Sequence, residues 1–344
     1  MDQVYKTNIL WSRLKVGHFL LSLGGERATE VCEHGDKHGV AAPNVIVAAM
    51  DEYTWPDGST TESGDLVSSD GMHAINMWLY DSKTEAGKQL VTVASPTFSG
   101  MNLYAALLEY TQQWGMVWKD TMIEGRQARY IDYYVIRVDL SSLDPMSAPG
   151  KRLSEAVTLA ITFIGYKPNI EKYYINAIMS RWNLKDSNQH FLNFAGGTHE
   201  EMQQLLKSIR QMLVNTDKFG DDVVVKKLPI SVIEGPLIRR TEARTWRCHM
   251  PLSYTTFANG VVELWKYTEK EELGENTLRL VTQSGRHGCC YRARALIDKT
   301  GVANHKVDEL IERHFRWKPD IGKMRKRYAG ILDMSDRMMV TLLF

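Results

Sequence analysis

Short apolar runs separated by turn residues most strongly constrain the fold. NVIVAAM, HAINMWLY and QLVTVAS, which lie between Asn44 and Ser95, are rich in β-branched and aromatic residues. Turn material such as WPDGS and DSKTEAGK stands between them, and Asp57-Gly58 is suited to the positive φ angles of a tight turn. ARYIDYYVIRVDL, residues 128–140, has the same strand composition. The pattern predicts an antiparallel sheet.

Helices are predicted between and after these strands. The N-terminal segment reads as an amphipathic helix closed by Gly24-Gly25, and a second helix is expected over 102–114. Two more are expected over 154–163 and after Pro168-Asn169. The clearest signal is a capping box, because Thr198 and Glu201 precede apolar residues at helical spacing.

The last third returns to strand patterns. DVVVKKLPISVI, LRLVTQS, CCYRARALI and MMVTLLF read as strands, a short helix is expected over 307–315, and Asn259-Gly260 in SYTTFANGVVELWKYT predicts a type I′ hairpin. The turn-rich stretch 144–152 marks a boundary. The expected fold is α+β, mostly antiparallel, with two β-rich lobes flanking a helical middle. We place the N-terminal helix and an acidic lobe in 1–145, the helical segment in 146–220, and a basic lobe in 221–344.

Composition indicates a globular chain inside the cell, in the cytoplasm or nucleus, or within a virion. The 344 residues are 44% hydrophobic and 24% charged. The longest apolar run, VTLAITFIG, is far shorter than the roughly 20 residues that span a bilayer, and the N-terminus lacks a signal-peptide cleavage pattern. Four cysteines in so long a chain form no disulfide framework.

Charge is distributed unevenly along the chain. Residues 1–225 carry 20 Lys and Arg against 27 Asp and Glu, a net −7, whereas residues 226–344 carry 22 against 14, a net +8. Such polarity points to nucleic acid or to complementary self-association, although domains also differ in charge without any functional reason.

Familiar catalytic motifs are missing from the sequence. EAGKQ lacks the first glycine and the Ser/Thr of a P-loop, no G-x-G-x-x-G follows a strand, and Ser99-Gly100 is only half of a nucleophile elbow. Metal ligation could use the cluster CEHGDKHG, and a site that also includes RHGCC requires the two clusters to meet in space; we assign no metal and no cofactor. The residues that could supply ligands are Cys32, His34 and His38, with Glu33 or Asp36 nearby, and His287, Cys289 and Cys290.

Aromatic residues are interspersed among cationic residues in the C-terminal third. RWKPDIGKMRKRYAG, residues 316–330, holds six cations, and arginine dominates two earlier clusters. Guanidinium groups pair with phosphate in two parallel hydrogen bonds, and rings stack on unpaired bases. The predicted nucleic-acid contacts are Arg239, Arg240, Arg244, Trp246, Arg247, Tyr291, Arg292, Arg294, Arg316, Trp317, Lys323, Arg325, Lys326, Arg327 and Tyr328.

Three functions remain open. The leading one is a nucleocapsid- or coat-like structural protein that binds single-stranded nucleic acid, RNA in the first place, and forms homo-oligomers without spanning a membrane. The alternatives are a protein-only shell component, whose charge polarity serves subunit contacts, and a metal-dependent enzyme without a short signature motif. The same clusters also suit ordinary salt bridges, core aromatics and a polar connector.

Overall fold

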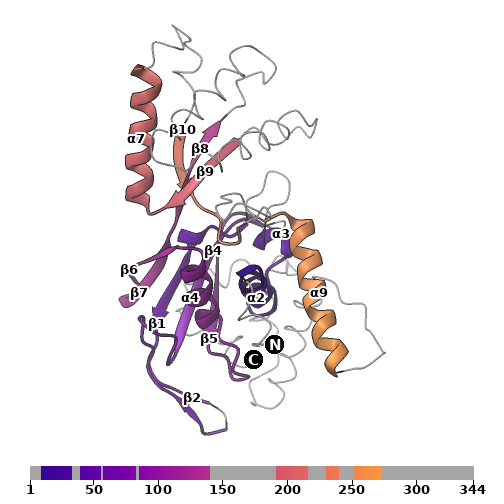
Figure 1. The fold of residues 1–344 in the computed structure, drawn as a ribbon. Coiled ribbons are helices and arrows are strands. Elements are labelled where there is room, and N and C mark those ends of the chain that lie inside the picture. The colour runs from indigo at the N-terminus through magenta and orange to yellow at the C-terminus, as the bar shows by residue number, and fades with distance from the viewer. Residues whose placement is uncertain are drawn as a thin grey trace. The chain divides into compact units, whose positions relative to one another are not determined.

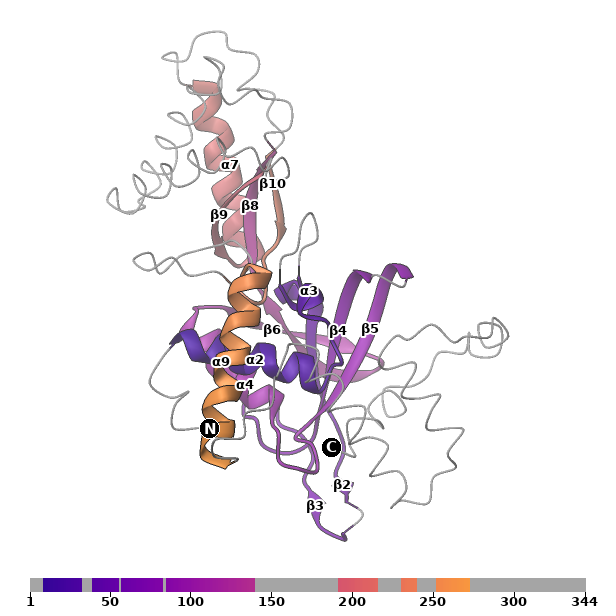
Figure 2. The same cartoon turned by 90° about the vertical axis from the view of Figure 1, so that its right-hand side faces the viewer.

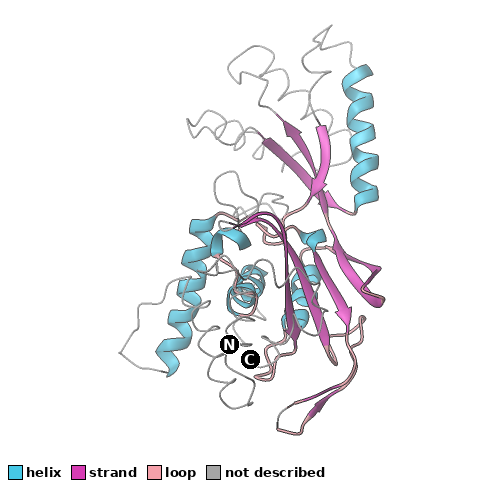
Figure 3. Ribbon diagram, turned by 180° about the vertical axis from the view of Figure 1, so that it is seen from behind, coloured by secondary structure: helices cyan, strands magenta, loops and turns pink. Residues whose placement is uncertain are grey.

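The chain forms two compact units in a computed structural model that describes residues 9–32, 39–55, 57–82, 85–139, 191–215, 230–239 and 252–272. Unit 1 comprises Met1–Ile131, Leu237–Arg239 and Pro251–Phe344, and unit 2 comprises Asp132–Pro236 and Arg240–Met250. Helices combine with mostly antiparallel sheets, which confirms the α+β class. Figure 3 separates the two kinds of element by colour. The predicted boundaries near 145 and 220 lie outside the described residues.

Unit 1 is built on a five-stranded sheet with the strand order β5-β4-β1-β7-β6 (Figure 1). The strands are β1 (Val45–Ala49), β4 (His73–Ser82), β5 (Glu85–Ser95), β6 (Val117–Ile123) and β7 (Arg126–Asp132). β1 pairs antiparallel with β4 and β7, and β4 pairs antiparallel with β5. The three apolar runs and the start of ARYIDYYVIRVDL are therefore strands, as predicted. A short hairpin of β2 (Tyr53–Thr54) and β3 (Thr60–Thr61) turns at Gly58, whose φ is +86°.

A row of alanines crosses one face of this sheet. Ala94, Ala74, Ala48 and Ala128 are neighbours in register on β5, β4, β1 and β7, and all are buried. The small side chains leave room for a larger group, and Trp55 packs in the same cluster. This cluster of buried side chains holds the β2–β3 hairpin beside the sheet.

Helices cover the opposite face. α4 (Leu103–Gln113) begins at Asn102, whose side chain accepts a hydrogen bond from Ala105 N, a cap worth about 1 kcal/mol. α2 (Ile9–Ser22) forms an ion pair with α4 between Lys15 and Glu109. The predicted N-terminal helix is present, but it is not amphipathic, because every side chain from Trp11 to Ser22 is buried or half-buried. Two short elements follow it, α3 (Ala28–Val31) and the 3₁₀-helix η1 (Ala42–Asn44).

α9 (Tyr254–Glu272) replaces the predicted Asn259-Gly260 hairpin, which is wrong. α9 packs against α2 through two glycines (Figure 2). Gly17 of α2 faces the buried ring of Phe257, and Gly260 of α9 faces the side chain of Leu14. Each helix thus receives a large side chain at a residue without Cβ, and this tertiary packing overrides the local turn preference.

A three-residue strap, Leu237–Arg239, is buried in unit 1 and held on several sides. Leu237 N donates to Val40 O, and the Tyr110 hydroxyl donates to Leu237 O at 2.7 Å while accepting from Arg239 N at 3.2 Å. Arg13 donates to Arg239 O. Burial raises the pKa of Tyr110 to about 12, so the hydroxyl remains a donor at neutral pH.

Unit 2 contains a three-stranded antiparallel sheet of order β10-β8-β9, with α7 (His199–Asn215) along it (Figure 1). The strands are β8 (Tyr134–Asp139), β9 (Phe191–Gly197) and β10 (Ile230–Glu234). The capping box is confirmed, because Glu201 N donates to Thr198 Oγ1 and Thr198 N donates to a Glu201 carboxylate oxygen. β9 was not predicted. The predicted strand over 128–140 is divided at the buried Tyr133 into β7 and β8, which belong to different sheets.

Several predicted elements lie outside the described residues: the helices over 154–163 and after Pro168-Asn169, the strands LRLVTQS, CCYRARALI and MMVTLLF, and the helix over 307–315. Within the described ranges, the helices are too short or too polar to cross a membrane.

Candidate functional site

The connection from β3 to β4 forms a closed loop over residues 62–72, which we call the anchored loop. Met72 N donates to Glu62 O and Gly64 N donates to Met50 O, each at 2.9 Å, so the base of the loop lies next to the end of β1. Gly71 has a φ of +74°, a backbone conformation that glycine adopts without strain. These bonds close the loop onto the sheet.

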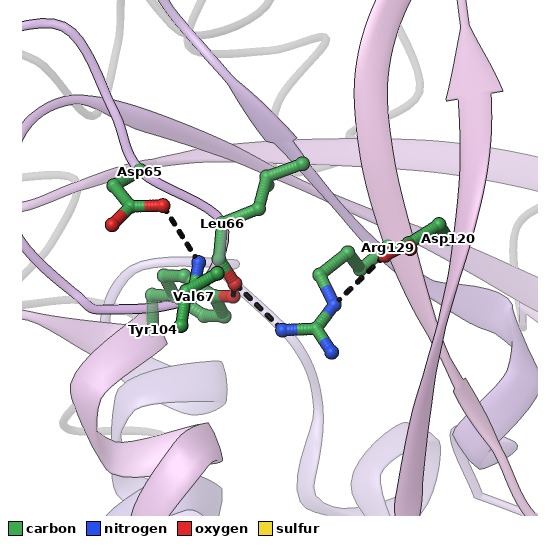
Figure 4. A network of polar contacts seen from close by, with 6 residues as sticks. All are labelled: Asp65, Leu66, Val67, Tyr104, Asp120 and Arg129. Atoms are coloured by element: carbon green, nitrogen blue, oxygen red, sulfur yellow. Dashed lines mark hydrogen bonds and ion pairs between the residues drawn. The ribbon is translucent and has the colours of Figure 1, made fainter.

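Backbone carbonyls of the anchored loop bind side chains of the framework (Figure 4). Leu66 O accepts from Arg129 Nη1 and from the Tyr104 hydroxyl, both at 2.7 Å. Ser69 O accepts from Asn102 Nδ2 at 3.2 Å, and Asp65 O lies 2.8 Å from His73 Nε2. The loop is therefore held at three of its backbone carbonyls as well as at its two ends.

The groups that hold the loop sit on regular secondary structure. Arg129 is on β7, His73 on β4 and Tyr104 on α4. The Tyr104 ring lies 4.6 Å from the His73 ring and meets Trp118 of β6 edge-on at 5.7 Å. Arg129 Nε lies 3.2 Å from Asp120 Oδ1 of β6, an ion pair that is not aligned as a hydrogen bond. Donors fixed in this way give a preorganised surface, as recognition loops require.

Apolar side chains project to solvent from this region. Val67, at the tip of the anchored loop, is 81% exposed, although Asp65 Oδ1 holds its backbone N–H at 2.9 Å. Met122 is 60% exposed and lies two residues beyond Asp120, on the same side of β6. Exposed apolar side chains mark a surface that binds another macromolecule where they gather into one patch.

Exposed carboxylates are frequent in the same stretch of chain as Val67. Residues 51–70 contain six acidic residues and neither Lys nor Arg. We define the acidic corner as the exposed carboxylates of Asp51, Glu52, Asp57, Glu62, Asp65, Asp70 and Asp120. Two of these carboxylates form ion pairs with arginines of β7: Asp51 with Arg126 at 2.9 Å, and Asp120 with Arg129. Hydrogen bonds from Ser59 lower the pKa of Asp57, which keeps that carboxylate ionised.

The stability of the folded chain should depend on the protonation of His73. His73 is buried, and burial lowers its pKa from 6.5, although the carbonyls of Asp65, Gly71 and Ser95 and the Asp65 charge oppose this. The unfolded chain then binds more protons than the folded chain between the two pKa values. We expect the free energy of unfolding to fall as the pH drops below about 6.5, by at most about 1.4 kcal/mol per unit for this group.

Urea unfolding of the full chain between pH 7.5 and 5.0 measures this slope. His73→Gln should flatten it. Parallel curves for wild type and His73→Gln would assign the acid sensitivity to other groups.

Arg239 is the predicted nucleic-acid contact that lies among the described residues, and it is buried. The residue is 3% exposed, Nη1 donates to Trp114 O at 3.1 Å, and the guanidinium carbon is 4.9 Å from the centre of the Trp114 ring. An arginine enclosed in this way has no surface to offer a phosphate, so we leave it out of the contact set. The other predicted contacts lie outside the described residues.

Of the possible metal ligands, Cys32 is described. It is buried, and its Sγ donates to Ala28 O at 2.8 Å at the end of α3. His34, His38, His287, Cys289 and Cys290, and the nearby Glu33 and Asp36, lie outside the described residues. The described part of the chain brings no three His, Cys, Asp or Glu side chains together as a metal site would.

The anchored loop was not singled out from the sequence. Its composition, SGDLVSSDG, is ordinary turn material, and the only available signal was the absence of any cation between Asp51 and Asp70. The geometry of the loop is the basis for assigning it a role. The chain matches no family model, no curated protein and no solved structure.

Proposed function

We propose that this chain is an assembly protein that binds single-stranded nucleic acid, RNA in the first place, through its C-terminal third, and that it self-associates as nucleocapsid and coat proteins do. The observation that carries the proposal is the charge polarity. The acidic corner of unit 1 is exposed, whereas cations are in excess after Lys226 and have aromatic residues interspersed among them. A polyanion is repelled by the first region and attracted by the second.

The contact set is the predicted one without Arg239. Phosphates would pair with the arginines and lysines, and unpaired bases would stack on Trp246, Tyr291, Trp317 and Tyr328. The exposed apolar tip at Val67 favours a protein contact as well, which fits self-association. A protein-only shell shares that feature, and binding of a single-stranded oligonucleotide separates the two functions.

Titration of a fluorescent single-stranded oligonucleotide into nuclease-treated protein at several salt concentrations tests the proposal. The logarithm of the association constant should fall linearly with the logarithm of salt concentration, with a slope of about −0.7 for each phosphate neutralised. Changing Arg325, Lys326 and Arg327 together to Glu should weaken binding by at least about tenfold at low salt and reduce the slope by roughly 2.

A matched control carries the same change of charge elsewhere. Lys37→Glu, Lys83→Glu and Lys207→Glu alter three lysines of the acidic first 225 residues and should leave affinity close to the wild type. Equal losses in both triple variants would indicate a response to net charge alone. Affinity that is unchanged in the C-terminal variant would remove residues 325–327 from the interface.

A further inference from the structure

We propose that the acidic corner is the docking surface for the basic segment, residues 316–330, of a second copy of this chain. The inference rests on the self-association in the proposed function and names the two surfaces that meet. It does not require that nucleic acid be bound.

The surface is suited to docking because its backbone is fixed before a partner arrives. Arg129 and Tyr104 hold Leu66 O, Asn102 holds Ser69 O, and His73 holds Asp65 O. Binding to such a loop costs little conformational entropy, so the exposed side chains at its tip contribute their contacts with less loss. Figure 4 shows the fixed carbonyl at Leu66 beside Val67 and the Asp65 carboxylate.

The two surfaces match in charge. Residues 51–70 present six carboxylates with no cation, and residues 316–330 carry six cations with one carboxylate, Asp320. Asp120 adds a further exposed carboxylate beside the anchored loop. Facing charges of opposite sign raise the rate of encounter and set the orientation of the contact.

The two surfaces also match in apolar content. Val67 and Met122 are exposed close in sequence to carboxylates, and the basic segment has four large apolar side chains among its cations: Trp317, Ile321, Met324 and Tyr328. An aromatic side chain covering an exposed aliphatic group supplies the buried centre that an interface needs, with the charges as its rim.

We take a second copy as the occupant because its basic segment complements the charge of the corner, whose described residues are exposed. Val67 remains 81% exposed and the carboxylates are exposed. Addition of a strand to the edge of β6 is a less suitable mode, since Lys119 and Asp120 at the middle of that strand discourage backbone pairing. Corner-to-segment contacts join different surfaces of two copies, so the association is head-to-tail and can continue from copy to copy.

Complementation between two variants tests this geometry. The corner variant carries Glu52→Gln, Glu62→Gln and Val67→Ser, all at exposed positions, and the segment variant carries Arg325→Gln, Lys326→Gln and Arg327→Gln. Nuclease-treated full-length proteins are examined by sedimentation velocity at low salt. We expect each variant alone to self-associate at least about tenfold more weakly than the wild type.

The mixture gives the decisive result. The intact segment of the corner variant can dock on the intact corner of the segment variant, so an equimolar mixture should form a complex of two chains that grows no further. Variants that associate as the wild type does, or a mixture that forms no complex, would overturn the proposal. A mixture that forms no complex is also the outcome if the segment docks on the corner of its own chain.

Oligonucleotide binding separates this inference from the proposed function. The corner variant should bind the oligonucleotide at least as tightly as the wild type, because no predicted nucleic-acid contact is changed and a competing acidic surface is weakened. Complementation in a chain that binds no oligonucleotide would support the docking surface and refute the proposed function. Oligonucleotide binding without complementation would support the proposed nucleic-acid binding and refute the docking surface.

Discussion

Arg239→Ala is expected to lower the free energy of unfolding by about 3 kcal/mol. The substitution removes a buried hydrogen bond to Trp114 O and a contact with the Trp114 ring. The carbonyl left without its donor costs about 1–3 kcal/mol, and the lost cation–π contact and the cavity add to this. The strap Leu237–Arg239 would then be held mainly by the bonds of its backbone to Tyr110, Arg13 and Val40.

Urea unfolding of the full chain measures this loss, with Arg126→Ala as the control. Arg126 pairs with the exposed Asp51 at the surface, and such pairs are worth about 1 kcal/mol or less. The Arg239→Ala protein should remain folded without urea. Under that condition, its affinity for the oligonucleotide should equal that of the wild type. Lost affinity together with unchanged stability would return Arg239 to the set of phosphate contacts.

Arg239 also shows why a sequence overstates a basic cluster. IRRTEARTWRCH reads as one cationic surface, but the strap turns Arg239 inward, where Trp114 from the end of α4 receives it. The two residues are 125 positions apart, and no local pattern indicates that they meet. Charge density predicted a contact, whereas tertiary packing made this residue part of the core.

The fold was predictable where the signal is local. The strands of residues 45–95 are short apolar runs separated by turn residues, and the capping box at the start of α7 lies within four consecutive residues. The anchored loop has no such signal. Leu66 meets Tyr104 and Arg129 from 38 and 63 positions away, so its rigidity exists only in the folded chain.

α9 contained two competing local signals. Asn259-Gly260 favours a hairpin turn, but Phe257, Val261 and Leu264 follow helical spacing and all are buried. Ser253 also stands before the first turn, where its Oγ accepts from Thr256 N. The helix prevails because Gly260 allows α9 to approach Leu14 of α2, a benefit that appears only once the two helices pack.

The packing of α2 on α9 leads to the second large effect: Gly17→Val should destabilise the chain by about 3 kcal/mol. A Cβ at position 17 would overlap Cε2 and Cζ of Phe257, a ring that is fully buried. Valine adds two further methyl groups there, and overpacking of this kind costs about 1–3 kcal/mol, occasionally more. Glycine is a weaker helix former than valine by a few tenths of a kcal/mol, so helix propensity alone predicts the opposite sign.

A double-mutant cycle with Phe257→Leu isolates the contact. Leucine lacks the outer ring atoms that face Gly17, so Gly17→Val should cost at least about 1.5 kcal/mol less in that background than in the wild type. In a Met122→Ala background, which changes an exposed residue of β6, the cost should be as in the wild type. If Gly17→Val costs the same in all three backgrounds, the glycine does not serve the approach of Phe257, and the reason for α9 being a helix must lie in its other contacts.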